Sequence, residues 1–397
     1  MVALTTLAAA TGGLLALGAA EAFAHRRRLQ QIPCRIHVAG TRGKSSVTRL
    51  VAAGLRAGQR VTAAKTTGTL PRMILPDGRE WPVFRPRGAN INEQVRIVAT
   101  AHRLGAQALV LECMALQPEL HWLSEHKMVR ATHAVITNAR PDHLDVMGPT
   151  DADVARCLAG MIPVGGVLVT AEQKHRAILE AAAADRGTRI IVVEPEAVDA
   201  VSAADMSGFS HVEHRENVAV ALALLQELGV RRSVALRGMW EATPDPGALT
   251  AHEMDFFGRR ITFVNAFAAN DPDSTTKIWE IALREHGAEV DKVVAVFNLR
   301  ADRASRTRQL ARDTTFWRDA DEIVLVGTGA YHFAREASRV GFSPDRFAYA
   351  EDESALEVFE RVVELCGQRT LVVGLANIGG IGMELTRLFR NRRRLAS

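Results

Sequence analysis

A glycine-rich segment near the start of the chain holds the residue types best suited to phosphate chemistry. Residues 40–46 read GTRGKSS and lie between a strand-like run, 34–39, and a segment with apolar residues at helical spacing, 45–57. Glycines let such a loop point its N–H groups at phosphate oxygens, and the amino end of the following helix adds partial positive charge. Lys44 would neutralise the outer phosphates of a nucleotide, and the Ser45 hydroxyl would bind Mg²⁺. The predicted ATP-binding residues of this loop are Gly40, Thr41, Arg42, Gly43, Lys44, Ser45 and Ser46.

The spacing of this loop is shorter than the usual phosphate-loop pattern. In that pattern four residues separate a first glycine from the Gly-Lys pair, and Val38 occupies the place of this first glycine here. A glycine turn with a solvated lysine is therefore the alternative interpretation of the segment.

A carboxylate follows another strand-like run. Residues 108–111 read ALVL and are followed by Glu112. In open parallel sheets, ligands collect at the carboxyl ends of the strands, and a carboxylate there can bind Mg²⁺ through oxygen. A glutamate at the end of a strand is also commonly a surface residue, so both roles stay open for Glu112.

Residues 138–145, NARPDHLD, concentrate polar side chains directly after the strand-like run 134–137. Asn, Asp and His at such a position suit metal coordination and phosphoryl chemistry. The alternative is a helix capped by Asp142, with His143 in solvent. We predict that Ser45, Glu112 and His143 bind Mg²⁺ and that Lys44, Glu112 and His143 are catalytic.

Strand-like and helix-like segments alternate along the chain, which predicts an α/β fold with parallel sheets. The turn-rich segment 238–247 separates two such series. We predict a membrane anchor with a basic flank at 1–28, a central phosphate-loop ATPase domain with a parallel sheet at 29–237, and a smaller Rossmann-like α/β domain at 238–397. The predicted strands are 34–39, 108–111, 134–137, 166–170, 189–193, 260–264, 292–297, 322–326 and 370–374.

The first residues have the length and composition of a membrane-spanning helix. Residues 2–20 carry no charge, which is about the length that crosses a bilayer. The basic run 26–28 follows, so the positive-inside rule places the remaining chain at the cytoplasmic face of the cell membrane. A cleaved signal peptide and an alanine-rich helix buried in the protein are the alternatives.

Composition excludes several functional classes. Hydrophobic residues make up 47% and charged residues 24%, as in folded proteins. A net charge of only +4 and 5% aromatic residues argue against a nucleic-acid partner. The four cysteines are scattered without a Cys-x-x-Cys pair, which argues against zinc-knuckle and thioredoxin-like sites.

The three motifs together resemble those of the Mur ligase superfamily, which includes the peptidoglycan amino-acid ligases and folylpolyglutamate synthase. The short loop at 40–45, the strand-terminal Glu112 and the Asn-x-x-x-Asp-His-x-Asp segment at 138–145 occur in the same order as in that family. The resemblance implies nucleotide contacts by Asn138, Asn217, Asp302 and Arg303.

Further segments resemble the poly-γ-glutamate synthases of this superfamily, which make capsule polymer. The matching segments are 65–69, 87–94, 112–115, 137–148 and 377–382. The resemblance implies substrate contacts by Lys65, Thr67, Arg87, Asn90 and Asn92. One departure concerns the metal, because Leu158 stands where many members carry a lysine that helps to hold a second Mg²⁺.

The implied activity is that of an ATP-dependent carboxylate–amine ligase that uses ATP and Mg²⁺. It would activate the γ-carboxylate of a growing polymer as an acyl phosphate and add glutamate. The implied partners are glutamate, the polyglutamate chain, the membrane, and small membrane proteins of a capsule synthesis and export complex. A membrane-tethered phosphate-loop NTPase and a nucleotide-gated scaffold of a membrane complex are the alternatives.

Replacing Lys44 with alanine tests the assignment of the loop. Loss of the ammonium charge should lower the rate of ATP-dependent ligation by roughly 10²–10⁴, because this charge stabilises the transition state. Product formation by the variant and by the unaltered protein at equal concentration measures the effect. Normal ligation by the variant would refute the assignment.

Overall fold

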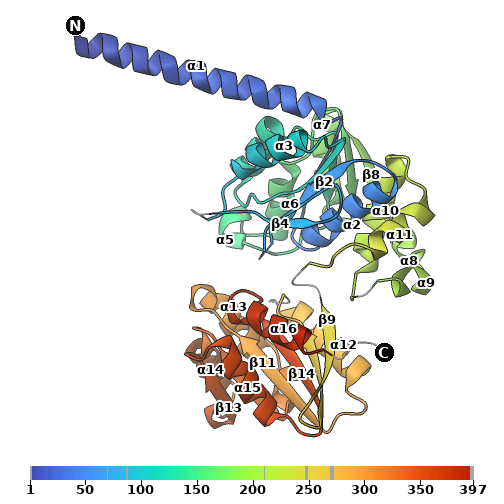
Figure 1. The fold of residues 1–397 in the computed structure, drawn as a ribbon, viewed down its shortest axis with the longest axis vertical. Coiled ribbons are helices and arrows are strands. Elements are labelled where there is room, and N and C mark those ends of the chain that lie inside the picture. Colours follow the sequence, from blue (N-terminus) through green and yellow to red (C-terminus); the bar gives the residue numbers. More distant parts are fainter. Residues whose placement is uncertain are drawn as a thin grey trace. The chain divides into compact units, whose positions relative to one another are not determined.

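The computed structural model describes residues 2–68, 70–85, 88–209, 211–245, 249–268 and 272–393 (Figure 1). The chain forms two compact units, and each is described by itself. The first comprises Met1–Phe209 and Glu213–Asp245, and the second comprises Ser210–Val212 and Pro246–Ser397.

The first unit surrounds an eight-stranded sheet with the order β4-β3-β2-β5-β1-β6-β7-β8. Its strands are β1 (Cys34–Ala39), β2 (Thr62–Lys65), β3 (Arg72–Ile74), β4 (Glu80–Pro82), β5 (Ala108–Glu112), β6 (His133–Ile136), β7 (Val167–Thr170) and β8 (Arg189–Val192). Its helices are α1 (Val2–Gln31), α2 (Lys44–Ala57), α3 (Glu93–Arg103), α4 (Pro118–Leu123), the π-helix η1 (Ser124–Val129), α5 (Leu144–Met147), α6 (Asp151–Ala159), α7 (Arg176–Asp185), α8 (Pro195–Asp199), α9 (Ala203–Ser207), α10 (Arg215–Glu227) and α11 (Arg232–Trp240).

The prediction of an α/β fold is confirmed, but the first sheet is mixed and not wholly parallel. Strand β3 pairs antiparallel with both β2 and β4, whereas the other neighbouring strands of this sheet pair parallel. The physical reason is a hairpin between β3 and β4, where Leu75 accepts a hydrogen bond from the Gly78 amide at 2.9 Å and Gly78 has φ 86°. An Asp-Gly turn favours such a hairpin. The outer strand β4 is only three residues long, and its Trp81 and Pro82 are exposed.

Helices cover both faces of this sheet (Figure 1). On one face, alternate strand residues such as Ile36, Val38 and Val110 pack with apolar side chains of α2, α10 and α11. On the other face, α6 and α7 pack over β6 and β7, and α3 packs over β5. Burial on both faces explains the nearly continuous apolar runs of the central strands.

The strand register brings three strand ends to one edge of the sheet. β1 lies between β5 and β6, all parallel, with Val38 paired to Glu112 and Ala39 paired to Ile136. The loop that follows β1 therefore begins beside the carboxyl ends of both neighbouring strands.

Helix α1 is continuous from Val2 to Gln31 and is long and apolar enough to cross a membrane. Its apolar window is not buried against the described chain, which contradicts the alternative of a core helix. Only its last turns pack on the first unit, where Leu29 is buried and His25 Nε2 lies 2.8 Å from the Met128 carbonyl oxygen.

The second unit surrounds a six-stranded sheet with the order β13-β12-β11-β14-β10-β9, in which only β9 pairs antiparallel among the described strands. Its strands are β9 (Thr250–Phe256), β10 (Arg259–Asn265), β11 (Lys292–Asn298), β12 (Glu322–Val326), β13 (Phe347–Ala350) and β14 (Arg369–Ala376). Its helices are α12 (Pro272–His286), η2 (Ala301–Arg303), α13 (Ala304–Asp313), η3 (Phe316–Asp319), α14 (Ala330–Arg339), η4 (Pro344–Arg346), α15 (Ala355–Leu365) and α16 (Ile381–Asn391). Apolar clusters fill both faces of this sheet. This unit is thus also α/β, with an antiparallel edge strand that the sequence did not reveal.

A close contact between two helices generates a stability prediction. Gly238 of α11 packs against α2, and a Cβ added there would lie 2.6 Å from both the Ala53 carbonyl oxygen and the Ala57 Cβ. The Gly238→Ala variant should lower the free energy of unfolding by about 1–3 kcal/mol, because the helices must move apart. Urea unfolding followed by circular dichroism measures the change. The exposed Ser233→Ala change in the same helix is the control, and it should alter stability by less than about 0.5 kcal/mol.

Candidate active site

The glycine-rich loop turns tightly against the end of β6. Gly40 has φ 129°, and a Cβ there would lie 1.9 Å from Thr137 Oγ1. Gly43 has φ 80°, and a Cβ there would lie 2.4 Å from Asn217 Oδ1 of α10. Neither position can accept a side chain without strain or displacement of these neighbours.

Hydrogen bonds from the segment after β6 hold the loop in place. The Asn138 side-chain oxygen accepts from Thr41 Oγ1 at 2.7 Å and from the Arg42 amide at 3.1 Å. Thr137 Oγ1 donates to the Arg42 carbonyl oxygen at 2.6 Å. Asn138 is therefore a support of the loop in this structure, and its predicted contact with the nucleotide stays a prediction.

Lys44 and the start of α2 form the cationic part of the loop. Lys44 Nζ donates to the carbonyl oxygens of Gly40 at 2.7 Å and Thr41 at 3.3 Å, so the ammonium group lies over the loop. The N-cap residue of α2 is Gly43, and no side chain caps this helix end. Its first N–H groups thus remain suited to an anion such as phosphate.

Ser45 and Glu112 meet as the sequence predicted. Ser45 Oγ donates to Glu112 Oε2 at 2.9 Å, and the same oxygen accepts from the Thr67 amide at 2.7 Å. Glu112 is buried, which contradicts the alternative of a surface carboxylate. Hydroxyl and carboxylate oxygens at one point are the ligands that a hard divalent cation prefers, so these residues fit Mg²⁺.

His143 adopts a left-handed backbone conformation with φ 46° at the start of α5. Its ring nitrogen Nε2 lies 4.0 Å from Asp142, which accepts a hydrogen bond from Arg42 at 2.9 Å. The alternative of a helix capped by Asp142 is wrong, because the helix begins at Leu144. Within the described ranges, no group of three His, Cys, Asp or Glu side chains is placed to hold a metal, so metal binding by His143 stays a prediction.

Asn217 lies in the first turn of α10 and is buried against the loop. Its Nδ2 donates to Glu213 at 2.8 Å, which leaves Oδ1 directed at Gly43. This contact places Asn217 at the loop, and the direct contact of Asn217 with the nucleotide stays a prediction.

The predicted substrate residues fall into separate surroundings. Lys65 is fully buried and lies 2.6 Å from Glu93 Oε1. Asn90 and Asn92 are exposed at the start of α3, where Asn90 Oδ1 accepts from the Asn92 amide at 2.9 Å. Arg87 lies outside the described residues.

Sequence reasoning missed Glu93 and Arg85. Arg85 donates to Glu93 through Nε at 2.6 Å and Nη2 at 2.9 Å, and it also donates to the Thr67 carbonyl oxygen at 3.4 Å. Glu93 was within a segment that matched the family resemblance. A glutamate at the start of a helix is usually solvated, so its type gave no sign of burial.

Two predicted nucleotide contacts belong to the second unit. Asp302 accepts from Arg300 at 2.6 and 2.9 Å, and Arg303 Nη1 donates to Asn377 Oδ1 at 3.4 Å. These contacts describe the second unit alone. The roles of Asp302 and Arg303 toward a nucleotide stay predictions.

Cys113, the residue after Glu112, belongs to a buried group of two imidazoles, a carboxylate and a thiol. His37 Nδ1 lies 2.8 Å from Glu125 Oε2, and Cys113 Sγ lies 3.5 Å from His121 Nδ1. Burial alone would lower the pKa of both imidazoles, but pairing with Cys113 and Glu125 raises that of His37 to about 9, and pairing with Cys113 raises that of His121 to about 10. The four cysteines are buried and free, as expected of reduced thiols.

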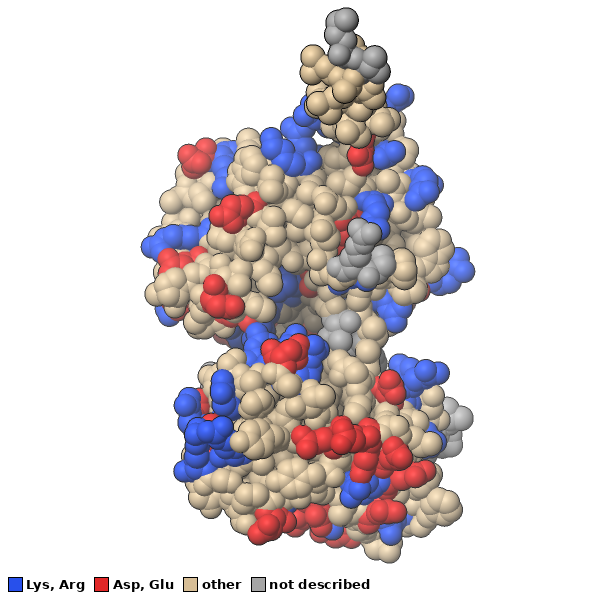
Figure 2. Space-filling view, turned by 90° about the vertical axis from the view of Figure 1, so that its left-hand side faces the viewer, with Lys and Arg blue, Asp and Glu red and all other residues tan. Residues whose placement is uncertain are grey.

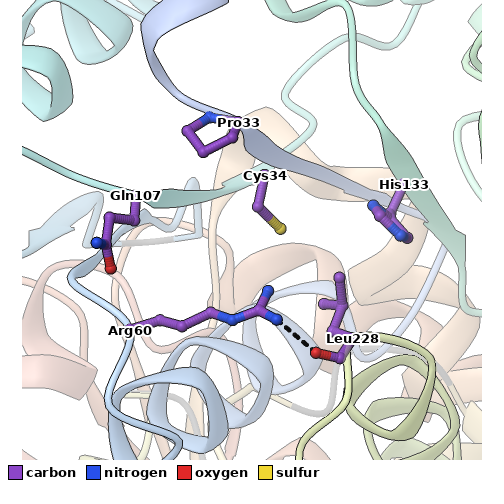
Figure 3. Close-up of a pocket in the computed structure, with 6 residues that line it drawn as sticks. All are labelled: Pro33, Cys34, Arg60, Gln107, His133 and Leu228. Carbon is purple, nitrogen blue, oxygen red and sulfur yellow. Dashed lines mark hydrogen bonds between the residues drawn. The ribbon is translucent and has the colours of Figure 1, made fainter.

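A cavity of about 410 Å³ lies at the opposite edge of the sheet (Figure 3). Cys34 begins β1 and His133 begins β6, so the cavity adjoins the amino ends of the strands whose carboxyl ends form the candidate site. Arg60 Nη2 donates to the Leu228 carbonyl oxygen at 2.5 Å and closes one wall. The cavity is therefore separate from Ser45 and Glu112. Its lining residues are Pro33, Cys34, Arg60, Gln107, His133 and Leu228.

Comparison with known protein families accounts for most of the chain. Residues 38–225 match the Mur ligase middle domain, and residues 251–392 match the poly-gamma-glutamate synthase CapB C-terminal domain. The capsule biosynthesis protein CapB of Bacillus anthracis is 36% identical over 92% of this chain and 78% of that protein. The PGA synthase CapB of Bacillus subtilis is 33% identical over 92% of this chain and 93% of that protein.

Solved structures of folylpolyglutamate synthases have a similar fold. The Mycobacterium tuberculosis enzyme has a TM-score of 0.66 at 17% identity and covers 94% of this chain and 95% of its own. The Thermotoga maritima enzyme has a TM-score of 0.62 at 15% identity and covers 93% of this chain and 92% of its own. At such identities the likeness concerns the fold alone.

The contact between Gly43 and Asn217 generates a binding prediction. The Gly43→Ala variant should lower the affinity for ATP roughly tenfold or more, because the methyl group strains the loop and displaces the Asn217 side chain. Isothermal calorimetry with Mg-ATP measures the change. Gly187→Ala is the matched control, since Gly187 has φ 60° but nothing within 4 Å of an added Cβ. Equal ATP affinity of the Gly43 variant and the unaltered protein would contradict the prediction.

Proposed function

This chain belongs to the CapB family of Mur ligases, and on that premise we propose that it adds glutamate to a growing γ-linked glutamate polymer. As a member of this family it is an ATP-dependent amide ligase. The two CapB relatives, named for capsule biosynthesis and PGA synthesis, support glutamate as the amine and poly-γ-glutamate as the product.

We expect this activity to require ATP as a substrate and a divalent cation as a cofactor. Among the solved structures with a similar fold, the FolC protein of Escherichia coli contains ADP, and the bifunctional folylpolyglutamate synthase/dihydrofolate synthase of Yersinia pestis contains AMPPNP and an Mn ion. A further structure in this group contains Mn, AMPPNP and L-glutamate. We take Mg²⁺ as the cation, held by the hydroxyl of Ser45 and the carboxylate of Glu112. The single observation that carries this proposal is their 2.9 Å contact beside the open end of α2.

The reaction follows from what each residue can do. The loop amides and Lys44 hold the outer phosphates of ATP, and a bound cation would supply further charge neutralisation there. A carboxylate oxygen of the polymer attacks the γ-phosphorus, the bond to ADP breaks, and an acyl phosphate forms. The neutral amine of glutamate then attacks the acyl carbon, the bond from this carbon to phosphate breaks, and the nitrogen loses one proton as the amide forms. Positioning and charge neutralisation supply the rate enhancement, so no protein nucleophile is required.

We also propose that α1 anchors the enzyme at the cytoplasmic face of a membrane. The helix is unburied over its apolar window, and Arg26 and Arg27 near its end are exposed. Figure 2 shows Lys and Arg side chains where this helix joins the first unit. Basic residues at this end favour the cytoplasmic side. A membrane position would also bring the polymer to the export partners that the family resemblance implies.

An assay of the full chain in membranes tests the proposed reaction. With Mg-ATP, glutamate and a short γ-linked glutamate acceptor, ATP consumption should require both the acceptor and glutamate, and the acceptor should lengthen by one residue. ATP hydrolysis that is independent of both would instead identify a membrane-tethered NTPase and overturn the ligase proposal.

Removal of the Glu112 charge tests the cation site. The Glu112→Gln variant should need roughly tenfold or more Mg²⁺ for half-maximal activity, because an amide is a weaker ligand than a carboxylate. A titration of Mg²⁺ at saturating ATP measures this. The Glu227→Gln change in α10, which alters an ion pair with Arg189 of β8, is the control and should leave the Mg²⁺ requirement unchanged. An unchanged requirement in the Glu112 variant would exclude this residue as a ligand.

A further inference from the structure

Three charged side chains form a buried cluster next to the candidate cation site. Glu93 accepts hydrogen bonds from Arg85 at 2.6 and 2.9 Å, and its Oε1 lies 2.6 Å from Lys65 Nζ. The Lys65 and Glu93 side chains are 0% and 2% exposed, and that of Arg85 is 16% exposed. Arg85 is thus the member of this cluster that solvent or a ligand can reach.

The cluster carries one positive charge in excess. Burial would raise the pKa of the Glu93 carboxyl group, but hydrogen bonds from Arg85 and the charge of Lys65 outweigh it and lower this pKa. Arg85 and Lys65 share the single carboxylate of Glu93, so the cluster holds two cations for one anion. Burial lowers the pKa of Lys65, and the charges of Glu93 and Glu112 oppose this. Because two cations share one carboxylate and Arg85 is partly exposed, the cluster is suited to an anionic ligand.

Thr67 connects this cluster to the candidate cation site. Arg85 Nη1 donates to the Thr67 carbonyl oxygen at 3.4 Å, and the Thr67 amide donates to Glu112 Oε2 at 2.7 Å. Gly68, the next residue, lies so close to Ser45 that an added Cβ would be 3.4 Å from its Oγ. Thr67 thus contacts both Arg85 and Glu112, so the cluster adjoins the candidate cation site.

We propose that Lys65, Arg85 and Glu93 form a carboxylate-binding subsite for the acceptor, which rests on the proposed function. The terminal glutamate of a γ-linked acceptor carries an α-carboxylate beside its reacting γ-carboxylate. The γ-carboxylate must reach the nucleotide, and the cluster receives the α-carboxylate. Arg85 contacts this group, Lys65 supplies the excess charge, and Glu93 is a positioning residue that holds both cations.

The test uses two acceptors with the full chain in membranes. One is a short γ-linked glutamate oligomer with a free terminal α-carboxylate, and the other is the same oligomer with this carboxylate converted to an amide. The unaltered enzyme should use the free acid roughly 10- to 100-fold better in kcat/KM, because a hydrogen-bonded charge pair is lost with the amide. Failure to extend the free acid would overturn the proposed function. Extension of both acceptors with equal kcat/KM would overturn the subsite alone.

Variants of the cluster residues test whether this cluster causes the preference for the free-acid acceptor over the amide. Arg85→Gln should raise the KM for the free-acid acceptor roughly 10-fold or more, leave the KM for ATP within about twofold, and abolish the preference over the amide. Arg85→Lys should restore part of the preference, and Arg79→Gln in the β3–β4 hairpin is the control that should change neither KM. Glu93→Gln should reduce the preference without changing ATP affinity. If the Arg85 and Glu93 variants keep the full preference, or lose ATP affinity and acceptor affinity equally, the cluster is only structural.

Discussion

The parallel pairing of β1 with β5 and β6 is the constraint on which the candidate site depends. Glu112 reaches Ser45 because its strand is paired with β1 at Val38, one residue before β1 ends. Side chains alternate between the two faces of a strand, so a slip of one residue in β5 would carry the carboxylate to the other face. The buried runs on both faces of these strands hold this register, which makes the packed core a determinant of site geometry.

The parts of the site that adjoin one another in the chain could be predicted from the sequence. Strand 34–39, the loop and the helix after it form one continuous unit, and the residue types of the loop indicate phosphate binding. The meeting of Ser45 with Glu112 was also predictable, since the ends of parallel strands lie at one edge of a sheet. Domain boundaries and the contribution of the second unit depend on weaker signals, because the motifs there depart further from the family pattern.

Contacts between distant segments could not be predicted in the same way. The buried charged cluster draws its members from a strand, a loop and a helix, namely Lys65, Arg85 and Glu93. Each of these residue types is usually found at the protein surface. Only the fold buries them together. The packing of Asn217 against Gly43 likewise depends on how α10 packs on α2. The Asp-Gly hairpin between β3 and β4 was not predicted, because each of these strands is only three residues long. Periodicity over so few residues is too weak to identify a strand.

Strand β4, at one edge of the first sheet, has a consequence for contacts between copies of the protein. A wide open sheet presents unpaired backbone groups at its edge, and these can pair with a strand of another molecule. Here the edge strand β4 is three residues long and ends in Pro82, which has no N–H to donate. Strand β4 is therefore a poor template for strand addition by another copy of the chain at this edge of the sheet.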